Sequence, residues 1–477
     1  MIENNYVKWF KKLINICIYL FFIFSFISNI FVYTSIFNGL LKYILLFVLL
    51  FIVILFIYFF KDRLKILINK LIKSISKLSK KKLLLIIVLS SLILKIIAYI
   101  FFFFDSTKFG GDITIYANLA DSIVNNGLSS IENNIYYLIG MAMHLSIFKY
   151  INIPYHVGIY IVFLIGTIIN YFSFSKLIGK EKSFILIELY LLMPSTSLLT
   201  FCITHELFVY LYFSIILFIL NLYLNSDKNN ILLVLLLFIF VTLNQTVSPI
   251  GKIWFIILFI LVLLSNIKIN KRITLLIVLV MTILSSNVVI SRLEVNTQSQ
   301  SNNVEQLLIG CDLNSMGRHT DGRGKNAAKK YWQAKGVELT YDNLVEGEKG
   351  ALIEEYKYLF THPLKLIELL ANKFYVVWSG DFYSIEYGYH MESISSMAYY
   401  IMLIMSALIW LLVISIGIVY FDKQEKNISI NTYKLLLLGI MSVLLITEVA
   451  NKYSCYMTIF IYFIAFARVD FKGESHE

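Results

Sequence analysis

Charged residues are scarce in this sequence. Asp, Glu, Lys and Arg make up 15% of its 477 residues, hydrophobic residues make up 59%, and there are only four prolines. A soluble protein of this length would carry far more charge. Apolar runs of about twenty residues recur along the chain, which is the length that a helix needs to cross a hydrocarbon core. The composition therefore predicts an all-α polytopic membrane protein.

Cysteine is also rare. Cys17, Cys202 and Cys455 fall within or beside apolar runs, and only Cys311 lies in a long polar stretch. This distribution contains neither a disulfide framework nor the spacing of a metal site, so we expect no metal and no cofactor. The first apolar run lacks the short core and small-residue cleavage site of a signal peptide, and we expect a retained span. No internal repeat supports the pseudo-symmetry of many secondary transporters.

Twelve apolar runs are long enough to cross a membrane. They lie at approximately 13–37, 41–60, 83–104, 156–176, 183–201, 203–224, 231–247, 251–267, 273–290, 395–420, 433–449 and 454–467. The segment 61–82 holds nine basic residues and one acid. Because loops rich in lysine and arginine stay in the cytoplasm, alternation of the runs predicts a multi-pass protein of the cell membrane with both termini in the cytoplasm.

The same alternation divides the chain into three parts. Residues 1–290 form a transmembrane region with a first outer loop at 105–155, residues 291–394 form a small α-rich extracytoplasmic domain, and residues 395–477 form a C-terminal transmembrane region. The net charge of +11 could indicate a nucleic-acid partner, but the basic residues lie mostly in short loops. We therefore expect membrane lipids, and no nucleic acid, as partners.

Two segments are predicted to lie at a membrane surface. The short apolar stretch from Tyr136 to Phe148 is expected to form a re-entrant or interfacial helix on the outer face, although it could span if another run does not. The basic segment 61–82 carries leucine and isoleucine among its lysines, which predicts an amphipathic helix on the anionic inner leaflet.

Few charges fall inside apolar runs, and each is a functional candidate by default; the clearest are Lys95, Glu188 and Glu206. Lys95 could reach outward or pair with a neighbouring helix, and Glu188 could pair with a cytoplasmic lysine. Glu206 differs, because it follows Thr204 and His205 where two runs meet the outer face. A Thr-His-Glu cluster there has no obvious value for stability, so Glu206 is a candidate site residue.

The first outer loop contains a second acidic candidate. Gly110 and Gly111 allow a sharp turn before Asp112, which begins a predicted helix with Tyr116, Ala120 and Ile123 on one face. Asp112 could simply cap the helix. An acid at the mouth of a membrane cavity also suits a general base, and the spacing alone does not separate the two roles.

These residues resemble a known family. The stretch Gly111-Asp112-x-x-x-Tyr116-x-x-Leu119-Ala120 resembles the acidic first-loop signature of GT-C-type glycosyltransferases, in particular bacterial relatives of the dolichyl-phosphate-mannose–protein mannosyltransferase family. Further similarities lie at Thr204 to Phe208, at His362-Pro363 and at Lys373 before Trp378. The sequence departs from the family at Ser248, where many relatives have a basic residue, and Lys252 could compensate.

The resemblance implies a GT-C-like fold and an inverting transfer of a sugar from a polyprenyl-phosphate donor to a cell-surface glycan or protein acceptor. It implies Asp112 as the base, with Glu206 as a second catalytic residue. The implied substrate-binding residues are Tyr116, His205, Arg318, Arg323, His362 and Lys373. Cations among them would hold the phosphate, since arginine grips it bidentately and lysine acts as a point charge.

Each assignment has a plainer alternative. Arg318 and Arg323 could belong to a solvated loop, Lys373 could extend its amino group along a helix into water, and His362 could mark a helix start before Pro363. Two other functions also remain open, a polysaccharide polymerase and a transporter of lipid-linked glycans. A transporter would need charged or broken helices at mid-membrane depth.

Overall fold

The computed structural model describes residues 5–34, 59, 63, 66, 69–102, 112–128, 131, 136–201, 204–226, 230–264, 267–293, 301–317, 323–340, 342–378, 396–419, 427–447 and 455–467. Within these ranges the regular elements are helices and there is no strand, which confirms the all-α prediction for the described residues.

The helices fall into a bundle and two groups beside it. The bundle contains α1 (Asn5–Thr34), α3 (Lys80–Phe102), α6 (Tyr155–Ile178), α7 (Lys180–Leu192), α8 (Pro194–Leu199), α9 (His205–Asn225), α10 (Ile231–Val247), η3 (Pro249–Lys252), α11 (Ile253–Leu264), α12 (Ile269–Leu293), α18 (Ser396–Val419), α19 (Ile428–Ile446) and α20 (Thr458–Ala467). The other helices are α4 (Asp112–Asn126), α5 (Tyr136–Tyr150), α13 (Ser301–Cys311), α14 (Arg323–Ala334), α15 (Leu344–Thr361) and α16 (Pro363–Trp378).

Six of the described helices, α1, α3, α6, α9, α12 and α19, are long and apolar enough to cross a membrane. Four shorter apolar helices accompany them: α10, α11 together with η3, α18 and α20. These helices support a polytopic membrane protein, but the predicted number of twelve membrane spans is not established. The predicted run 41–60 lies outside the described residues apart from Phe59.

The predicted run 183–201 is interrupted. It forms α7 and α8, which are separated at Met193 and resume with Pro194 in the first turn of α8. Proline has no backbone N–H and therefore cannot continue the hydrogen bonds of α7, whereas it suits a first helical turn.

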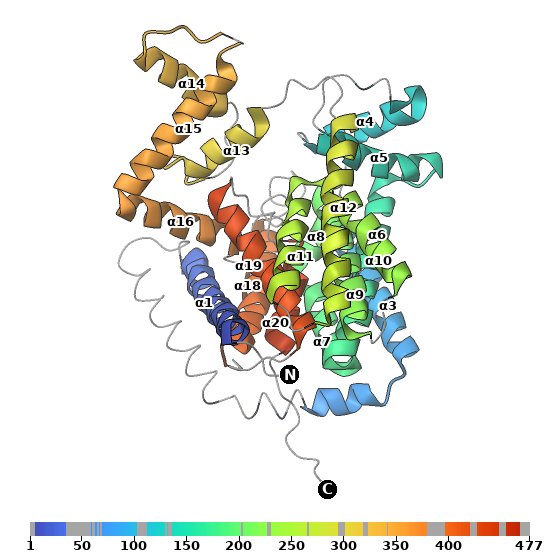
Figure 1. Cartoon of the computed structure of the whole chain (residues 1–477). Coiled ribbons are helices and arrows are strands. Elements are labelled where there is room, and N and C mark those ends of the chain that lie inside the picture. Colours follow the sequence, from blue (N-terminus) through green and yellow to red (C-terminus); the bar gives the residue numbers. More distant parts are fainter. Residues whose placement is uncertain are drawn as a thin grey trace.

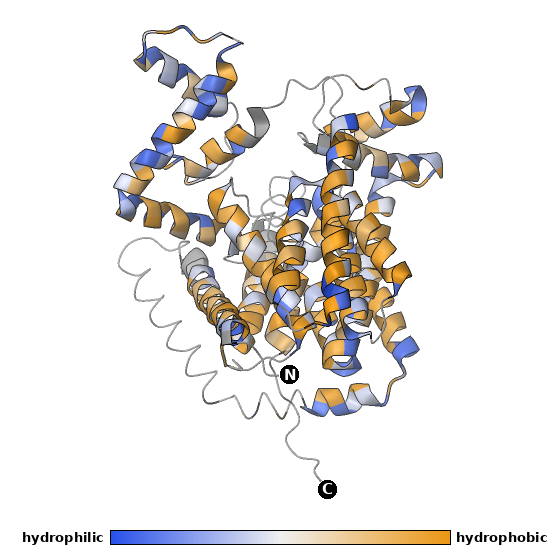
Figure 2. Cartoon of the chain, in the orientation of Figure 1, coloured by the Kyte–Doolittle hydropathy of each residue, from blue (hydrophilic) through white to orange (hydrophobic). Residues whose placement is uncertain are grey.

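Helices α4, α5 and α13–α15 lie at one end of the bundle, and the helix over 69–76 lies at the other (Figure 1). The first residues of α1 and the last residues of α20 lie at the same end of the bundle as the helix over 69–76. Hydrophobic residues cover the bundle, and hydrophilic ones gather on α14, α15 and the helix at 69–76 (Figure 2). Helix α5 has 15 residues and is not among the candidate spans, and its place at the membrane surface stays a prediction. The side of the membrane that each end faces stays a prediction.

Helices α9 and α20 occupy the centre of the bundle. Residues Thr458 to Phe466 are all buried, and the Phe463 ring stacks on Phe174 at 4.4 Å between centroids. Most of α9 is buried as well, whereas α3 and α12 leave most of their surface exposed. A helix that is apolar and buried on every side belongs to the core, so the first turn of α9 is shielded from lipid by its neighbours.

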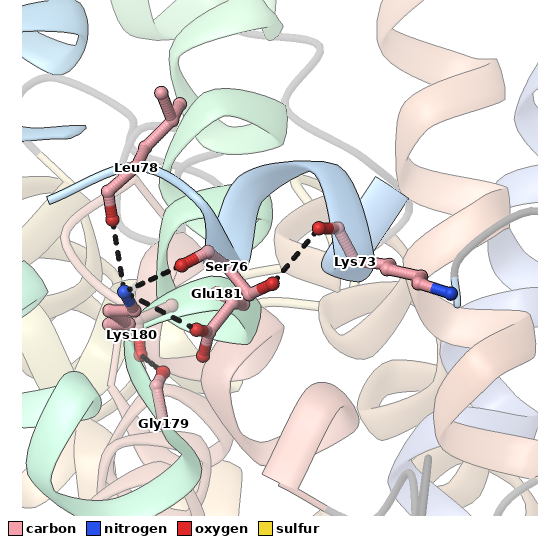
Figure 3. A network of polar contacts seen from close by, with 7 residues as sticks. Lys73, Ser76, Leu78, Gly179, Lys180 and Glu181 are labelled. Carbon is pink, nitrogen blue, oxygen red and sulfur yellow. Dashed lines mark hydrogen bonds and ion pairs between the residues drawn. The ribbon is translucent and has the colours of Figure 1, made fainter. Parts of the chain in front are cut away.

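The basic segment 69–79 is joined to α7 (Figure 3). Lys180 Nζ donates to the carbonyl oxygens of Ser76 at 3.2 Å and Leu78 at 3.0 Å, and it lies 3.7 Å from Glu181 Oε1. Ile75 is buried, while Lys73 and Lys77 are exposed. Ile66 and Leu71 are exposed as well, so the amphipathic character of 61–82 and its contact with anionic lipid stay predictions.

Candidate active site

Helix α4 carries the first acidic candidate. It begins at Asp112 as predicted, and Tyr116, Ala120 and Ile123 form its buried face. The side chain of Asp112 lies outside the described part of the structure. Asp112 and Tyr116 are one helical turn apart and therefore share a face of α4.

The first turn of α9 meets α4 through an imidazole. Thr204 is extended (φ −130°, ψ 150°), and α9 starts at His205. The Tyr116 Oη lies 3.0 Å from His205 Nδ1 within hydrogen-bonding distance. Glu206 Oε2 lies 3.6 Å from the same nitrogen, the His205 side chain is 15% exposed, and that of Glu206 is fully buried. The structure thus brings together Tyr116, His205 and Glu206, three of the residues predicted from the sequence.

The placement of Glu206 is unusual for a carboxylate. Buried charges are rare without partners, but Glu206 occupies the first turn of α9, where the helix dipole favours a negative charge. Its carboxyl group also lies close enough to the buried Tyr456 for electrostatic interaction. Tyr456 lies two residues before α20, which begins at Thr458, so Glu206 lies near the first residues of both central helices.

A second imidazole lies one turn deeper, between α5 and α9. His144 Nδ1 lies 2.7 Å from the Gly140 carbonyl oxygen, and a carbonyl only accepts, so Nδ1 carries the proton and Nε2 accepts from the Tyr212 hydroxyl. Burial lowers the pKa of His144, which favours this neutral form. The sequence prediction gave His144 no role, although a histidine within an apolar stretch was a usable signal.

Lys95 lies near the segment that leads into α9. Its Nζ donates to the Thr200 carbonyl oxygen at 3.0 Å and lies 4.1 Å from the Phe201 ring centroid. It therefore pairs with a neighbouring segment, one of the two predicted outcomes. Glu188 instead accepts from Ser90 Oγ at 3.0 Å, so its described partner is a serine and not the expected lysine.

The other predicted cations lie in the group formed by α13–α16. Arg323 is the first residue of α14, and its Nη2 lies 2.5 Å from Glu355 Oε1 and 3.3 Å from Asp312 Oδ1. Its side chain is 12% exposed, so it does not belong to a solvated loop. These contacts join α14 to α15 and to the end of α13. Contact of Arg323 with phosphate stays a prediction, and Arg318 lies outside the described residues.

Lys373 joins α16 to two other helices. Its Nζ donates to the carbonyl oxygens of Gly310 at 3.0 Å and Leu445 at 2.7 Å, and the residue is 0% exposed. The amino group therefore does not extend into water. Burial lowers the pKa of Lys373 to about 8, so the group is still charged at neutral pH. A Cβ on Gly310 would lie 2.3 Å from the Ile446 carbonyl oxygen, so the contact of α13 with the end of α19 requires glycine there.

His362 lies between α15 and α16. Its ring stacks on Tyr358 at 4.1 Å between centroids, and its Nδ1 lies 2.9 Å from the Tyr358 carbonyl oxygen. Helix α16 begins at the next residue, Pro363, which agrees with the plainer alternative that His362 marks the start of a helix. None of the described contacts brings His362, Arg323 or Lys373 to His205, and α13–α16 lie apart from α4 and α5 (Figure 1).

Glu348 makes the stability of α13–α15 dependent on pH. It is 3% exposed, and burial together with the charge of Glu305 raises its pKa from 4.5 to about 7. Between these values the folded state keeps a proton that the unfolded state loses, so stability falls as pH rises. We expect hydrogen-exchange protection of α13–α15, corrected for intrinsic rates, to weaken by about 1 kcal/mol from pH 5.5 to 7.5.

In Glu348→Gln this pH dependence should be much reduced. An equal dependence in the variant would show that Glu348 is not its source.

Comparison with protein-family models, curated proteins and solved structures finds no match for this chain. The functional interpretation therefore rests on the motif resemblance and on the contacts described above.

Proposed function

We propose that this chain is a GT-C-type glycosyltransferase that moves a sugar from a polyprenyl-phosphate donor to a cell-surface glycan or protein on the outer face of the cell membrane. The contact between Tyr116 and His205 carries the proposal. It ties the helix that begins at Asp112 to the first turn of α9, which holds Glu206. These are the two acidic positions at which the sequence resembles the family.

The reaction needs a base on the acceptor side. The acceptor hydroxyl gives its proton to the Asp112 carboxylate while its oxygen bonds to the anomeric carbon from the face opposite the phosphate. The bond from that carbon to the phosphate oxygen breaks, and the phosphate leaves with the electron pair. Glu206 and His205 position the acceptor, because the Glu206 carboxylate lies 3.6 Å from His205 Nδ1 and helps to orient the ring.

The leaving phosphate needs positive charge at the same end of the bundle. Arg318, Arg323 and Lys373 are the candidates from the resemblance, and the described bonds of Arg323 and Lys373 give those two residues a structural role as well. Lys95 is a further candidate, because its amino group lies beside Thr200 in the segment that leads to His205.

One observation favours transport as a second candidate function. The break between α7 and α8 at Met193 is the kind of discontinuity at which many transporters bind their substrates. The break is short, and Lys95 donates to the carbonyl oxygen of Thr200 just beyond α8. A structural role for Lys95 explains this contact as well.

The proposal is tested by profiling surface glycans of cells that carry the wild-type chain, lack it, or carry Asp112→Asn. Cells that lack the chain and cells that carry Asp112→Asn are both expected to lose one sugar decoration, while the length of their glycan chains stays normal. Asp121→Asn is the matched control, since Asp121 lies on the same helix but bonds to Tyr155 at 2.7 Å and Lys149 at 3.0 Å. The control should keep the decoration.

The other outcomes point elsewhere. Shortened glycans would indicate a polymerase, and lipid-linked glycan that accumulates on the inner leaflet would indicate a transporter. Unchanged glycans with normally expressed Asp112→Asn would exclude Asp112 as the base.

A further inference from the structure

Helix α16 carries an exposed stripe of apolar side chains. Leu364 is 80% exposed, Ile367 is 61% exposed, and Ala371 is exposed on the next turn. Residues three and four positions apart lie on one face of a helix. Together with the partly buried Phe374, these residues therefore form one row along α16, the α16 stripe. Single exposed apolar residues are common, but a contiguous apolar patch indicates a surface that binds a partner.

The other two faces of α16 differ from the stripe. Leu369, Lys373 and Val376 are buried against the neighbouring helices. Lys365 and Glu368 form an exposed polar face, on which their side chains pair at 2.8 Å. Helix α16 thus has a face for the protein, a polar face and an apolar face that the described helices leave exposed.

The α16 stripe continues onto α1. The Phe374 ring meets Phe24 edge-on at 6.0 Å and Phe21 at 5.8 Å between centroids. Phe24 is 53% exposed. It belongs to a row of exposed apolar residues along α1, spaced three or four apart: Leu13, Ile16, Leu20, Phe24 and Ile27. Because α1 is long and apolar enough to cross a membrane, this row is the surface that α1 offers to lipid tails.

The position of α16 suits a membrane surface. The helix runs across the upper end of α1 and lies below α14 and α15 in the view of Figure 1. Hydrophobic residues cover much of α16, whereas hydrophilic residues gather on α14 and α15 (Figure 2). A helix in the plane of the interface buries an apolar face at the boundary between headgroups and acyl chains and keeps its polar side chains in water.

We propose that the α16 stripe inserts into the leaflet beside the end of α1 and packs against the acyl chains of the surrounding lipid. The partner is bulk lipid and not a particular headgroup, because Lys365 and Glu368 leave the polar face without net charge. Since Lys373 joins α16 to the ends of α13 and α19, this insertion sets the depth at which α13–α16 rest on the membrane. Contact with lipid at α16 is independent of the reaction that the protein performs.

The test maps lipid contacts on the full-length protein in nanodiscs. The nanodiscs contain a phospholipid with a diazirine near the glycerol end of one acyl chain, and mass spectrometry locates the adducts after irradiation. We expect adducts on the α16 stripe at a level similar to that on Phe24. Ile353 is 68% exposed on α15, which rises away from α16 (Figure 1). It should carry at most about a tenth as many adducts, because it faces water.

Ile367→Asp and Ile353→Asp are matched variants. Both introduce the same charge in place of an isoleucine that is exposed in the structure, so neither disturbs the core. We expect Ile367→Asp to reduce the adducts on α16 about tenfold, since a carboxylate is costly among acyl chains. Adducts on Phe24 should stay unchanged, which shows that the variant is folded. Ile353→Asp should change neither level.

Four outcomes would contradict the proposal. Adducts on Phe24 without adducts on the α16 stripe would mean that the stripe faces water or protein. Chemical crosslinks between the α16 helices of two copies, with the stripe unlabelled, would assign the stripe to a dimer. Labelling of the stripe only in nanodiscs with anionic lipid would indicate a headgroup as the partner. Absence of adducts on both helices would show that the row on α1 does not face lipid either.

Discussion

Replacing Glu206 by glutamine is expected to reduce sugar transfer by about 100-fold or more, the range over which positioned acid–base groups act. Glutamine keeps the size of the side chain but removes the negative charge that lies 3.6 Å from His205 Nδ1. Without that charge the imidazole loses the carboxylate that helps to orient it in the site. The protein should stay folded, because removing a buried charge does not itself cost stability. Initial rates of transfer with the purified protein in nanodiscs measure the effect.

Glu188→Gln is the matched control. Glu188 is also a carboxylate within an apolar helix, but it accepts from Ser90 and has no described contact with α4 or α9. Its substitution should change the rate less than about threefold, because no group in the candidate site depends on it. If Glu206→Gln transferred sugar at the wild-type rate, Glu206 would have no part in catalysis, and the Tyr116 contact would be only structural.

Lys373→Glu is expected to destabilise the attachment of α13–α16 by about 4 kcal/mol. The wild-type ammonium donates to Gly310 near the end of α13 and to Leu445 near the end of α19. Both carbonyls lie at helix C-termini, where a positive charge is favourable and a negative one is not. A buried carboxylate there would face two carbonyl oxygens, which only accept hydrogen bonds. Limited proteolysis should therefore cleave α13–α16 at a temperature at which the wild type is resistant.

The control for this prediction is Lys365→Glu on the same helix. Lys365 is exposed and pairs with Glu368 at 2.8 Å, and such surface pairs contribute at most about 1 kcal/mol. The two variants make the same change of charge, so only the burial of Lys373 differs. Equal protease sensitivity of the two variants would contradict the described role of Lys373.

The apolar pattern predicted individual helices well. The run 231–247 became α10 with the same bounds, and the face of α4 that contains Tyr116, Ala120 and Ile123 is buried as expected. The run 183–201 was predicted as one span, although Pro194 was visible within it. Hydropathy averages side-chain polarity over a window, and it does not register the backbone hydrogen bond that proline removes.

The sequence by itself determined the membrane class, the extent of most helices and the first turn of α9 as a candidate site, because these depend on residues that are neighbours in the chain. Only the tertiary structure decided which side chains meet. It brought Tyr116 to His205, gave Lys373 two carbonyl partners and gave Arg323 two carboxylate partners. Such contacts depend on how helices pack across long separations in sequence. Hydrophobic periodicity shows which face of a helix is buried, but it does not identify the polar group on the helix that faces it.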